Sequence, residues 1–291
     1  MIRGYLYIIA SAVIFGTMPL MANLIYDQGV DAMTLVFLRS VLSLPLLAVL
    51  AWKQNGTLRL RRKTALKVSS IGLVGCCVTP LLLFASYRFL PSGTASVLHF
   101  VYPAAVALGG LVFFREKKSL REWIAMGICV VGIALFYDPG KPMDPWGAAL
   151  ALLSGVAYAA YILMLGTFHG PEAQEAKGFL FNFWAILACS VALLPVCLLG
   201  GGLKLPNSVE GWVLCAVFAM AVNGGAVALF QQGTFRIGGQ KAAILSTLEP
   251  ITGVILGVLV LQETIGLGTG IGTVLVIGAS ILIAAADMTH K

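Results

Sequence analysis

One carboxylate stands in the middle of an apolar run and is the strongest candidate for chemistry. Glu249 lies within the run from Lys241 to Leu261. An uncompensated charge near the centre of a bilayer costs at least about 2.5–3.5 kcal/mol, so such a residue marks a pathway, a proton site or a counter-ion. Glu249 can therefore alternate between holding a proton and holding a cationic group. The alternative is a structural glutamate, protonated or hydrogen-bonded at the helix break that Pro250 introduces.

A second polar pair lies in the first half of the chain. His99 and Tyr102 are three residues apart, so they share one face of a helix. A histidine inside a membrane can relay protons or orient a substrate carboxylate. Equally, it can donate one hydrogen bond to a neighbouring carbonyl and stay neutral. An offset of 147 residues between the two halves places Tyr102 opposite Glu249 and His99 opposite Ser246.

Arg39 is a third charged residue inside an apolar run, about two helical turns from its start. Its guanidinium can bind a substrate carboxylate through two parallel hydrogen bonds. Alternatively, Arg39 pairs with an acidic residue or extends to the outer surface, where Asp27 and Asp31 are near in sequence. We favour this second, structural role.

The remaining candidates are amide and aromatic side chains within apolar runs. Amides in membranes usually form hydrogen bonds between helices, so their first role is packing and substrate contact is secondary. Aromatic rings beside a carboxylate can enclose an ammonium group, although rings also serve ordinary packing and interface anchoring. The amides are Asn182, Asn223, Gln231 and Gln232, and the aromatic residues are Tyr87, Phe100, Tyr158, Tyr161 and Trp184.

Composition indicates that these residues belong to an all-α integral membrane protein. Of 291 residues, 59% are hydrophobic and 11% are charged, whereas soluble domains carry about 25% charged residues. Runs of about 20 apolar residues form spanning helices and are too long for barrel strands. We predict ten transmembrane helices, at residues 5–26, 32–52, 67–88, 93–114, 120–137, 146–167, 177–199, 212–235, 241–261 and 266–286.

The two halves of the chain repeat each other. Pro103 and Pro250 lie 147 residues apart, and the glutamates that end these two apolar runs keep the same spacing. Because five helices is an odd number, the second half must cross the membrane inverted. We predict a first repeat over residues 1–140 and an inverted second repeat over 141–291, forming one transmembrane domain. Inverted repeats with polar midplane residues are typical of secondary transporters that work by alternating access.

The basic residues predict the orientation of the helices. Most of the 19 Lys and Arg residues fall in connections that share one side of the membrane, such as 53–67 and 115–121. We therefore place both termini in the cytoplasm of a protein of the inner (plasma) membrane. The net charge of +7 follows this topology, so it does not indicate nucleic-acid binding. The first apolar run lacks a cleavage site and is expected to be retained as a span.

No feature of the sequence indicates a metal or a cofactor. The six cysteines lie in apolar runs without metal-ligand spacing, so we expect small core residues. Glycines at 266–272 lack a preceding strand and the order of a nucleotide-binding loop. Gly268 and Gly272 form a close-packing motif that could seat a homodimer or leave a groove facing lipid.

Taken together, these features resemble the EamA-like transporters of the drug/metabolite transporter superfamily. The resemblance rests on two five-helix halves with Tyr102-Pro103 and Glu249-Pro250 in the fourth and ninth helices, each run ending in glutamate. Arg39 also sits where the family often has arginine. The resemblance implies a cavity lined by helices one to four and six to nine. It implies transport of amino acids, amines, sugars or other small metabolites, often by proton-coupled export.

We therefore predict a secondary transporter of small amine-bearing metabolites, meaning amino acids or primary or quaternary amines, coupled to protons through Glu249. The alternative is transport of a neutral or anionic metabolite (a sugar, nucleoside or organic acid) with a structural Glu249. A channel or an intramembrane enzyme is more remote. His99 has no acidic or histidine partner four residues away, and no paired nucleophile and base is evident, so we expect no enzymatic activity.

Overall fold

The computed structural model describes residues 2–115, 119–135, 143–199, 202–237, 245–246, 248–260, 262 and 266–286. Within them the fold is all-helical and contains no strand. Seven helices in these ranges are long and apolar enough to cross a membrane: Ile2–Tyr26, Ala32–Asn55, Arg62–Ser86, Ser92–Phe113, Pro145–Gly166, Phe179–Leu199 and Val209–Phe230. Seven of the predicted ranges are therefore helices of membrane-spanning length.

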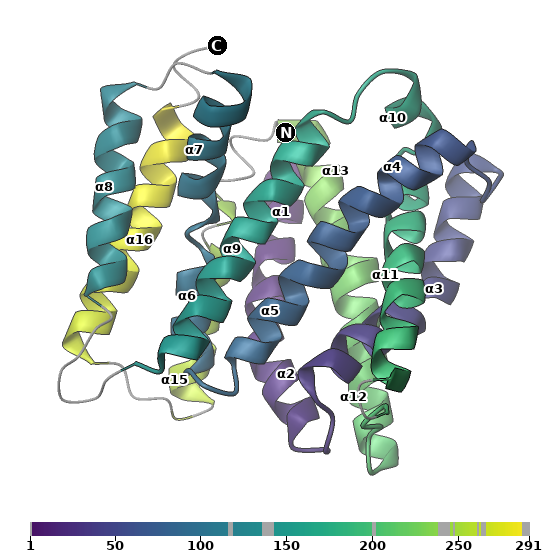
Figure 1. The fold of residues 1–291 in the computed structure, drawn as a ribbon, viewed down its shortest axis with the longest axis horizontal. Coiled ribbons are helices and arrows are strands. Elements are labelled where there is room, and N and C mark those ends of the chain that lie inside the picture. The colour runs from purple at the N-terminus through teal and green to yellow at the C-terminus, as the bar shows by residue number, and fades with distance from the viewer. Residues whose placement is uncertain are drawn as a thin grey trace.

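Three further helices lie in the other three ranges predicted to span the membrane. These are α8 (Leu120–Ala134), α15 (Leu248–Leu259) and α16 (Leu267–Ala286). The arrangement of ten spans stays a prediction. Figure 1 shows α8 and α16 side by side at one edge of the molecule. A Cβ atom on Gly268 would lie 2.7 Å from the carbonyl oxygen of Leu135, and one on Gly132 would lie 3.0 Å from that of Gly272. The Gly268/Gly272 motif therefore packs against α8 of the same chain, which neither of its predicted roles anticipated.

The first two spans begin and end at residues with clear local preferences. The first consists of α1 (Ile2–Gly16) and α2 (Met18–Tyr26), with Pro19 in the first turn of α2. The second is α3 (Ala32–Asn55). The Asp31 side chain accepts a hydrogen bond of 2.8 Å from the Thr34 amide, which caps the first turn of α3. Gly56 ends α3 with φ at 69°, a conformation that glycine adopts without strain.

Discontinuities also divide the third, fourth and eighth apolar runs. The third run comprises α4 (Arg62–Gly72), the π-helix η1 (Leu73–Val78) and α5 (Thr79–Ser86), and the fourth comprises α6 (Ser92–His99) and α7 (Tyr102–Phe114). After α9 (Pro145–Gly166), α10 (Pro171–Glu175) and α11 (Phe179–Leu199), the eighth run comprises α12 (Val209–Ala219), the π-helix η2 (Met220–Ala226) and α13 (Val227–Ile237).

The two π-helices begin 147 residues apart, at Leu73 and Met220, and the sequence analysis did not predict them. Each places an amide against a carbonyl five residues earlier, as Thr79 N–H does with Val74 O. This geometry redirects nearby carbonyls away from the regular helical ladder and is frequent at functional sites. Both π-helices contact α3.

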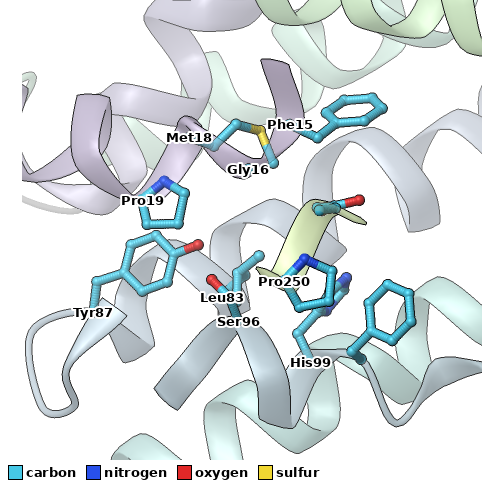
Figure 2. A pocket seen from close by; sticks show the side chains of 11 residues that line it. Phe15, Gly16, Met18, Pro19, Leu83, Tyr87, Ser96, His99 and Pro250 are labelled. Atoms are coloured by element: carbon cyan, nitrogen blue, oxygen red, sulfur yellow. The ribbon is translucent and has the colours of Figure 1, made fainter. Parts of the chain in front are cut away.

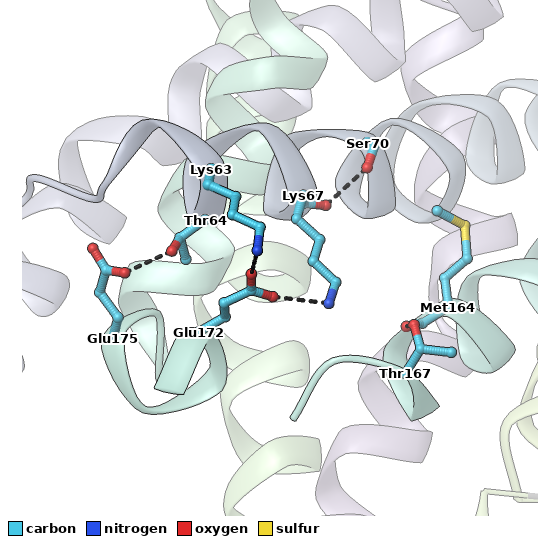
Figure 3. Close-up of polar contacts among 8 residues, drawn as sticks. All are labelled: Lys63, Thr64, Lys67, Ser70, Met164, Thr167, Glu172 and Glu175. Atoms are coloured by element: carbon cyan, nitrogen blue, oxygen red, sulfur yellow. Dashed lines mark hydrogen bonds and ion pairs between the residues drawn. The ribbon is translucent and has the colours of Figure 1, made fainter. Parts of the chain in front are cut away.

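Connections at one end of the bundle are tied together by acidic side chains of α10, a helix that the sequence analysis did not predict (Figure 3). Glu172 accepts a hydrogen bond of 2.8 Å from Lys67 Nζ. Glu175 accepts bonds of 2.6 Å from the Thr64 hydroxyl and the Arg61 amide at the start of α4. The bond from Lys67 lowers the pKa of the Glu172 carboxyl, and the bonds from Thr64 and Arg61 lower the pKa of Glu175.

Replacing Glu175 with glutamine is expected to loosen α10. The glutamine oxygen can still accept from the Arg61 amide and its NH2 group can donate to the Thr64 hydroxyl, but both bonds lose the carboxylate charge that strengthens them. Folding lowers the pKa of the Glu175 carboxyl below its ordinary value of about 4.3. The ionised carboxylate therefore stabilises the contact between α10 and α4 above about pH 4.3, and this stabilisation is lost as the pH falls through the lowered pKa. Hydrogen exchange at neutral pH should be faster for residues 171–175 in Glu175→Gln. The exposed Glu210→Gln is the control, and unchanged exchange in Glu175→Gln would contradict the expectation.

Candidate functional site

A small cavity lies where three helix discontinuities meet (Figure 2). The breaks are between α1 and α2, between α6 and α7, and at the first turn of α15. The free volume is about 10 Å³, close to what a single water needs. The structure is therefore closed around this point. The lining residues are Phe15, Gly16, Met18, Pro19, Leu83, Tyr87, Ser96, His99, Phe100, Glu249 and Pro250.

Proline accounts for the position of all three discontinuities. Pro19, Pro103 and Pro250 each lie in the first turn of a helix. A proline has no amide hydrogen, and its ring clashes with the carbonyl of the residue four positions earlier in a continuous helix. Proline is therefore favoured in the first turn of a helix and disfavoured in its interior. Pro103 and Pro250 were singled out in the sequence as helix breaks, and they lie in the first turns of α7 and α15.

Glu249 lies on the first turn of α15 and lines the cavity. Its amide donates a hydrogen bond of 3.0 Å to the carbonyl of the buried Ser246. The hydroxyls of Tyr102 and Tyr158 lie within electrostatic range of its carboxyl group. In the part of the chain that is described, no basic side chain forms an ion pair with Glu249. The cavity thus contains one carboxyl group without a counter-charge from these residues.

His99 ends α6 beside this carboxyl group. Its Nδ1 lies 2.8 Å from the hydroxyl oxygen of Ser154 on α9. The ring also packs against two tyrosines, with centroid distances of 5.9 Å to Tyr102 and 5.6 Å to Tyr158. Figure 2 draws His99 and Pro250 among the residues that line the cavity. Two predicted candidates from different halves, His99 and Glu249, therefore share one cavity.

The predicted aromatic residues divide into two groups. Tyr158 lies edge-on to Tyr102 at 4.9 Å and stacks on Tyr161 at 5.7 Å, which continues the aromatic cluster behind His99. Tyr87 lines the cavity from α5. Trp184 does not join them, because its indole N–H donates to the carbonyl of Leu58 in the connection before α4.

Arg39 is buried outside the cavity, with 6% of its surface exposed. Its Nη2 donates to the carbonyl of Cys76 in η1 at 3.3 Å, and the guanidinium lies 5.6 Å from the ring centroid of Phe84. It neither reaches the surface nor pairs with an acidic residue within the described ranges. Asp31 instead lies 3.5 Å from Lys204. The prediction that Arg39 extends to the surface or pairs with an acidic residue is therefore wrong for the described residues.

Two of the predicted amides, Asn223 and Gln232, form hydrogen bonds with residues other than Glu249. Asn223, in η2, donates to the Arg39 carbonyl at 3.1 Å and to the Ser43 hydroxyl at 3.0 Å, which links η2 to α3. Gln232 accepts a bond of 3.0 Å from Arg236 near the exposed end of α13. Asn182 is buried in α11, and the side chain of Gln231 lies outside the described residues.

Two contacts at the site were missed by the sequence analysis. Ser154 forms a hydrogen bond with His99, which lies 55 residues earlier in the sequence. No local pattern distinguishes this serine from others in apolar helices. Gly16 allows α1 to approach α15: a Cβ atom there would lie 2.7 Å from the carbonyl oxygen of Glu249 and would overlap Thr252. The proximity of Gly16 to Pro19 was the available signal for a break at this place.

The long apolar helices are those of a multi-pass membrane protein. The family comparison specifies the class. The EamA-like transporter family matches residues 2–137 and again residues 145–285, so the chain belongs to this family of transporters.

Similar proteins agree with this assignment. The chain is 24% identical over 288 residues to an uncharacterized inner membrane transporter, YicL, of Salmonella typhimurium, covering 97% of this chain and 95% of that one. It is 28% identical over 193 residues to the threonine/homoserine exporter RhtA of the same species, covering 63% and 59%. A solved crystal structure covers 99% of both chains with a TM-score of 0.65 and 14% identity, which supports the fold alone.

Proposed function

We propose that this transporter moves small amine-bearing metabolites by alternating access and exchanges them for protons at Glu249. The observation that carries the proposal is a carboxyl group enclosed where three helix breaks meet, without an ion-pair partner among the described residues. A carboxyl group in such a place can hold either a proton or an ammonium group, and this competition couples the two.

Amines suit the surroundings of Glu249 better than anions do. The rings of Phe15, Tyr87 and Phe100 line the cavity together with Glu249, and aromatic ring faces attract cations. Arg39, the basic side chain that could bind an anion, lies behind Phe84 and does not line the cavity. The partial similarity to an exporter named for threonine and homoserine is consistent with an amine-bearing substrate.

The proposed architecture is ten transmembrane helices in two inverted repeats, 1–140 and 141–291. Its supports are the 147-residue spacing of Pro103 and Pro250, the same spacing of the two π-helices, and the two successive family matches. We further propose an inner-membrane protein with both termini cytoplasmic. Lys67 and Glu172 join two connections that this topology assigns to the cytoplasm, and Lys204 and Asp31 join two that it assigns to the outside.

Purified protein in liposomes tests the proposed function. Vesicles loaded with an unlabelled amino acid, primary amine or quaternary amine should take up the same labelled compound by saturable counterflow. An imposed proton gradient should drive its accumulation. Counterflow restricted to a sugar, nucleoside or organic acid would support the alternative with a structural Glu249. Flux without counterflow would indicate a channel, and protein-free liposomes give the background.

A further inference from the structure

The hydrogen bonds at Ser154 determine which nitrogen of His99 carries a proton. The Ser154 hydroxyl lies 2.6 Å from the carbonyl oxygen of Ala151 and 2.8 Å from His99 Nδ1. A carbonyl oxygen only accepts hydrogen bonds, and a serine hydroxyl has a single hydrogen. At 2.6 Å the two oxygens must have that hydrogen between them, so Ser154 donates to Ala151.

His99 must then be the donor in its bond to Ser154. With the serine hydrogen committed to Ala151, the serine oxygen can only accept, so Nδ1 carries a hydrogen. A neutral imidazole has one N–H group and one lone-pair nitrogen. Nε2 is therefore the hydrogen-bond acceptor of the ring. Both Ser154 and His99 are buried, at 0% and 7% exposure, so water does not compete freely for these positions.

As a consequence, His99 and Glu249 both offer hydrogen-bond acceptors at the cavity. His99 and Glu249 line it together, so the fixed tautomer places a ring with a nitrogen lone pair at the same cavity as a carboxyl group. A primary ammonium group carries three N–H donors and can bond both acceptors at once, whereas a quaternary ammonium group has no donor.

We propose that Ser154 is a positioning residue that holds His99 in the Nδ1–H tautomer, so that the cavity selects primary ammonium groups over quaternary ammonium groups. This inference rests on the proposed function, since it specifies which amines Glu249 receives. It assigns Ser154 a role through His99 rather than a substrate contact of its own.

Nitrogen-15 NMR of the full-length protein with labelled histidine tests the tautomer without any transport assay. The chain has three histidines, and the His99 signals are those that disappear in His99→Asn. We expect a pyridine-type resonance for Nε2 and a pyrrole-type resonance for Nδ1 in the wild type. In Ser154→Ala the two assignments should exchange in a large fraction of molecules. A pyrrole-type Nε2 in the wild type, or unchanged signals in Ser154→Ala, would overturn the inference.

Transport in liposomes tests the selection. Ser154→Ala should raise the KM for a primary amine about tenfold, as expected for one lost hydrogen bond to a charged group. The KM for a quaternary amine of similar size should stay unchanged. Ser190→Ala is the matched control, because Ser190 also donates to a helical carbonyl, that of Ile186, and bonds to no histidine among the described residues. Equal loss for both amines would identify a merely structural serine and would overturn the inference.

The two measurements separate this inference from the proposed function. Amine transport together with a pyrrole-type Nε2 leaves the transporter proposal intact and overturns the role of Ser154. A wild type that moves no amine overturns the proposed substrate class and the amine selection together, whatever tautomer the NMR spectrum reports.

Discussion

Replacing Glu249 with glutamine should abolish proton-driven accumulation of substrate and leave the fold in place. Glutamine keeps the shape of the side chain but cannot be charged, so it holds neither a proton nor an ammonium group as glutamate does. Loss of a charge-assisted hydrogen bond should weaken substrate binding about tenfold or more. Residual exchange of substrate should no longer respond to a pH gradient.

Solute currents or uptake in liposomes, with and without a proton gradient, measure this effect. Glu122→Gln is a useful control because Glu122 is also buried, at 3% exposure, but caps the first turn of α8 with Ser119. That variant should lower thermal stability by about 1 kcal/mol without removing the response to pH. A Glu249→Gln protein with the wild-type rate and pH dependence would mean that Glu249 is structural.

Replacing Gly16 with alanine should be nearly as damaging, although alanine adds only a methyl group. The Cβ atom would lie 2.7 Å from the Glu249 carbonyl oxygen and would overlap the Thr252 side chain. Helix α15 must then move away from α1, or the backbone of α1 must shift. Overpacking of this kind costs about 1–3 kcal/mol. Here it also displaces the first turn of α15, which carries Glu249, so transport should fall together with stability.

Thermal unfolding in detergent and uptake in liposomes would measure both effects. Gly127→Ala provides the comparison, because a Cβ atom on Gly127 in α8 meets nothing within 4 Å. In a helix interior this change should be neutral or stabilise by about 0.5–1 kcal/mol. If Gly16→Ala unfolds and transports like Gly127→Ala, the close approach of α1 and α15 is not needed for the site.

Physical features that act locally were readable from the sequence. Apolar runs of membrane length predicted the seven spans because burial of every backbone amide in lipid requires a helix. The prolines at 103 and 250 indicated breaks through their missing amide hydrogens. Glu249 and His99 stood out because charged or titratable groups are rare at that depth. These two side chains do line one cavity.

Features that depend on contacts between helices were not readable. Nothing local distinguishes the residues of η1 from an ordinary apolar helix, and the segment α10 resembled a plain connection. The partner of Arg39 is a backbone carbonyl of Cys76, which has no sequence signature at all. Trp184 carried the same aromatic signal as Tyr158, yet its indole bonds to a connection at the end of the bundle. The type of a side chain predicted which residues were candidates for the site. The packing of the helices determined which of those candidates reach the cavity.

The matching positions of the two π-helices bear on the history of the chain. A π-helical turn contains one residue more than the α-helix around it needs, so it commonly records a single inserted residue. If the two halves descend from one duplicated unit, an insertion in that unit accounts for both segments at their 147-residue spacing. Insertion after duplication would require the same event twice. The extra residue is then older than the joining of the two halves.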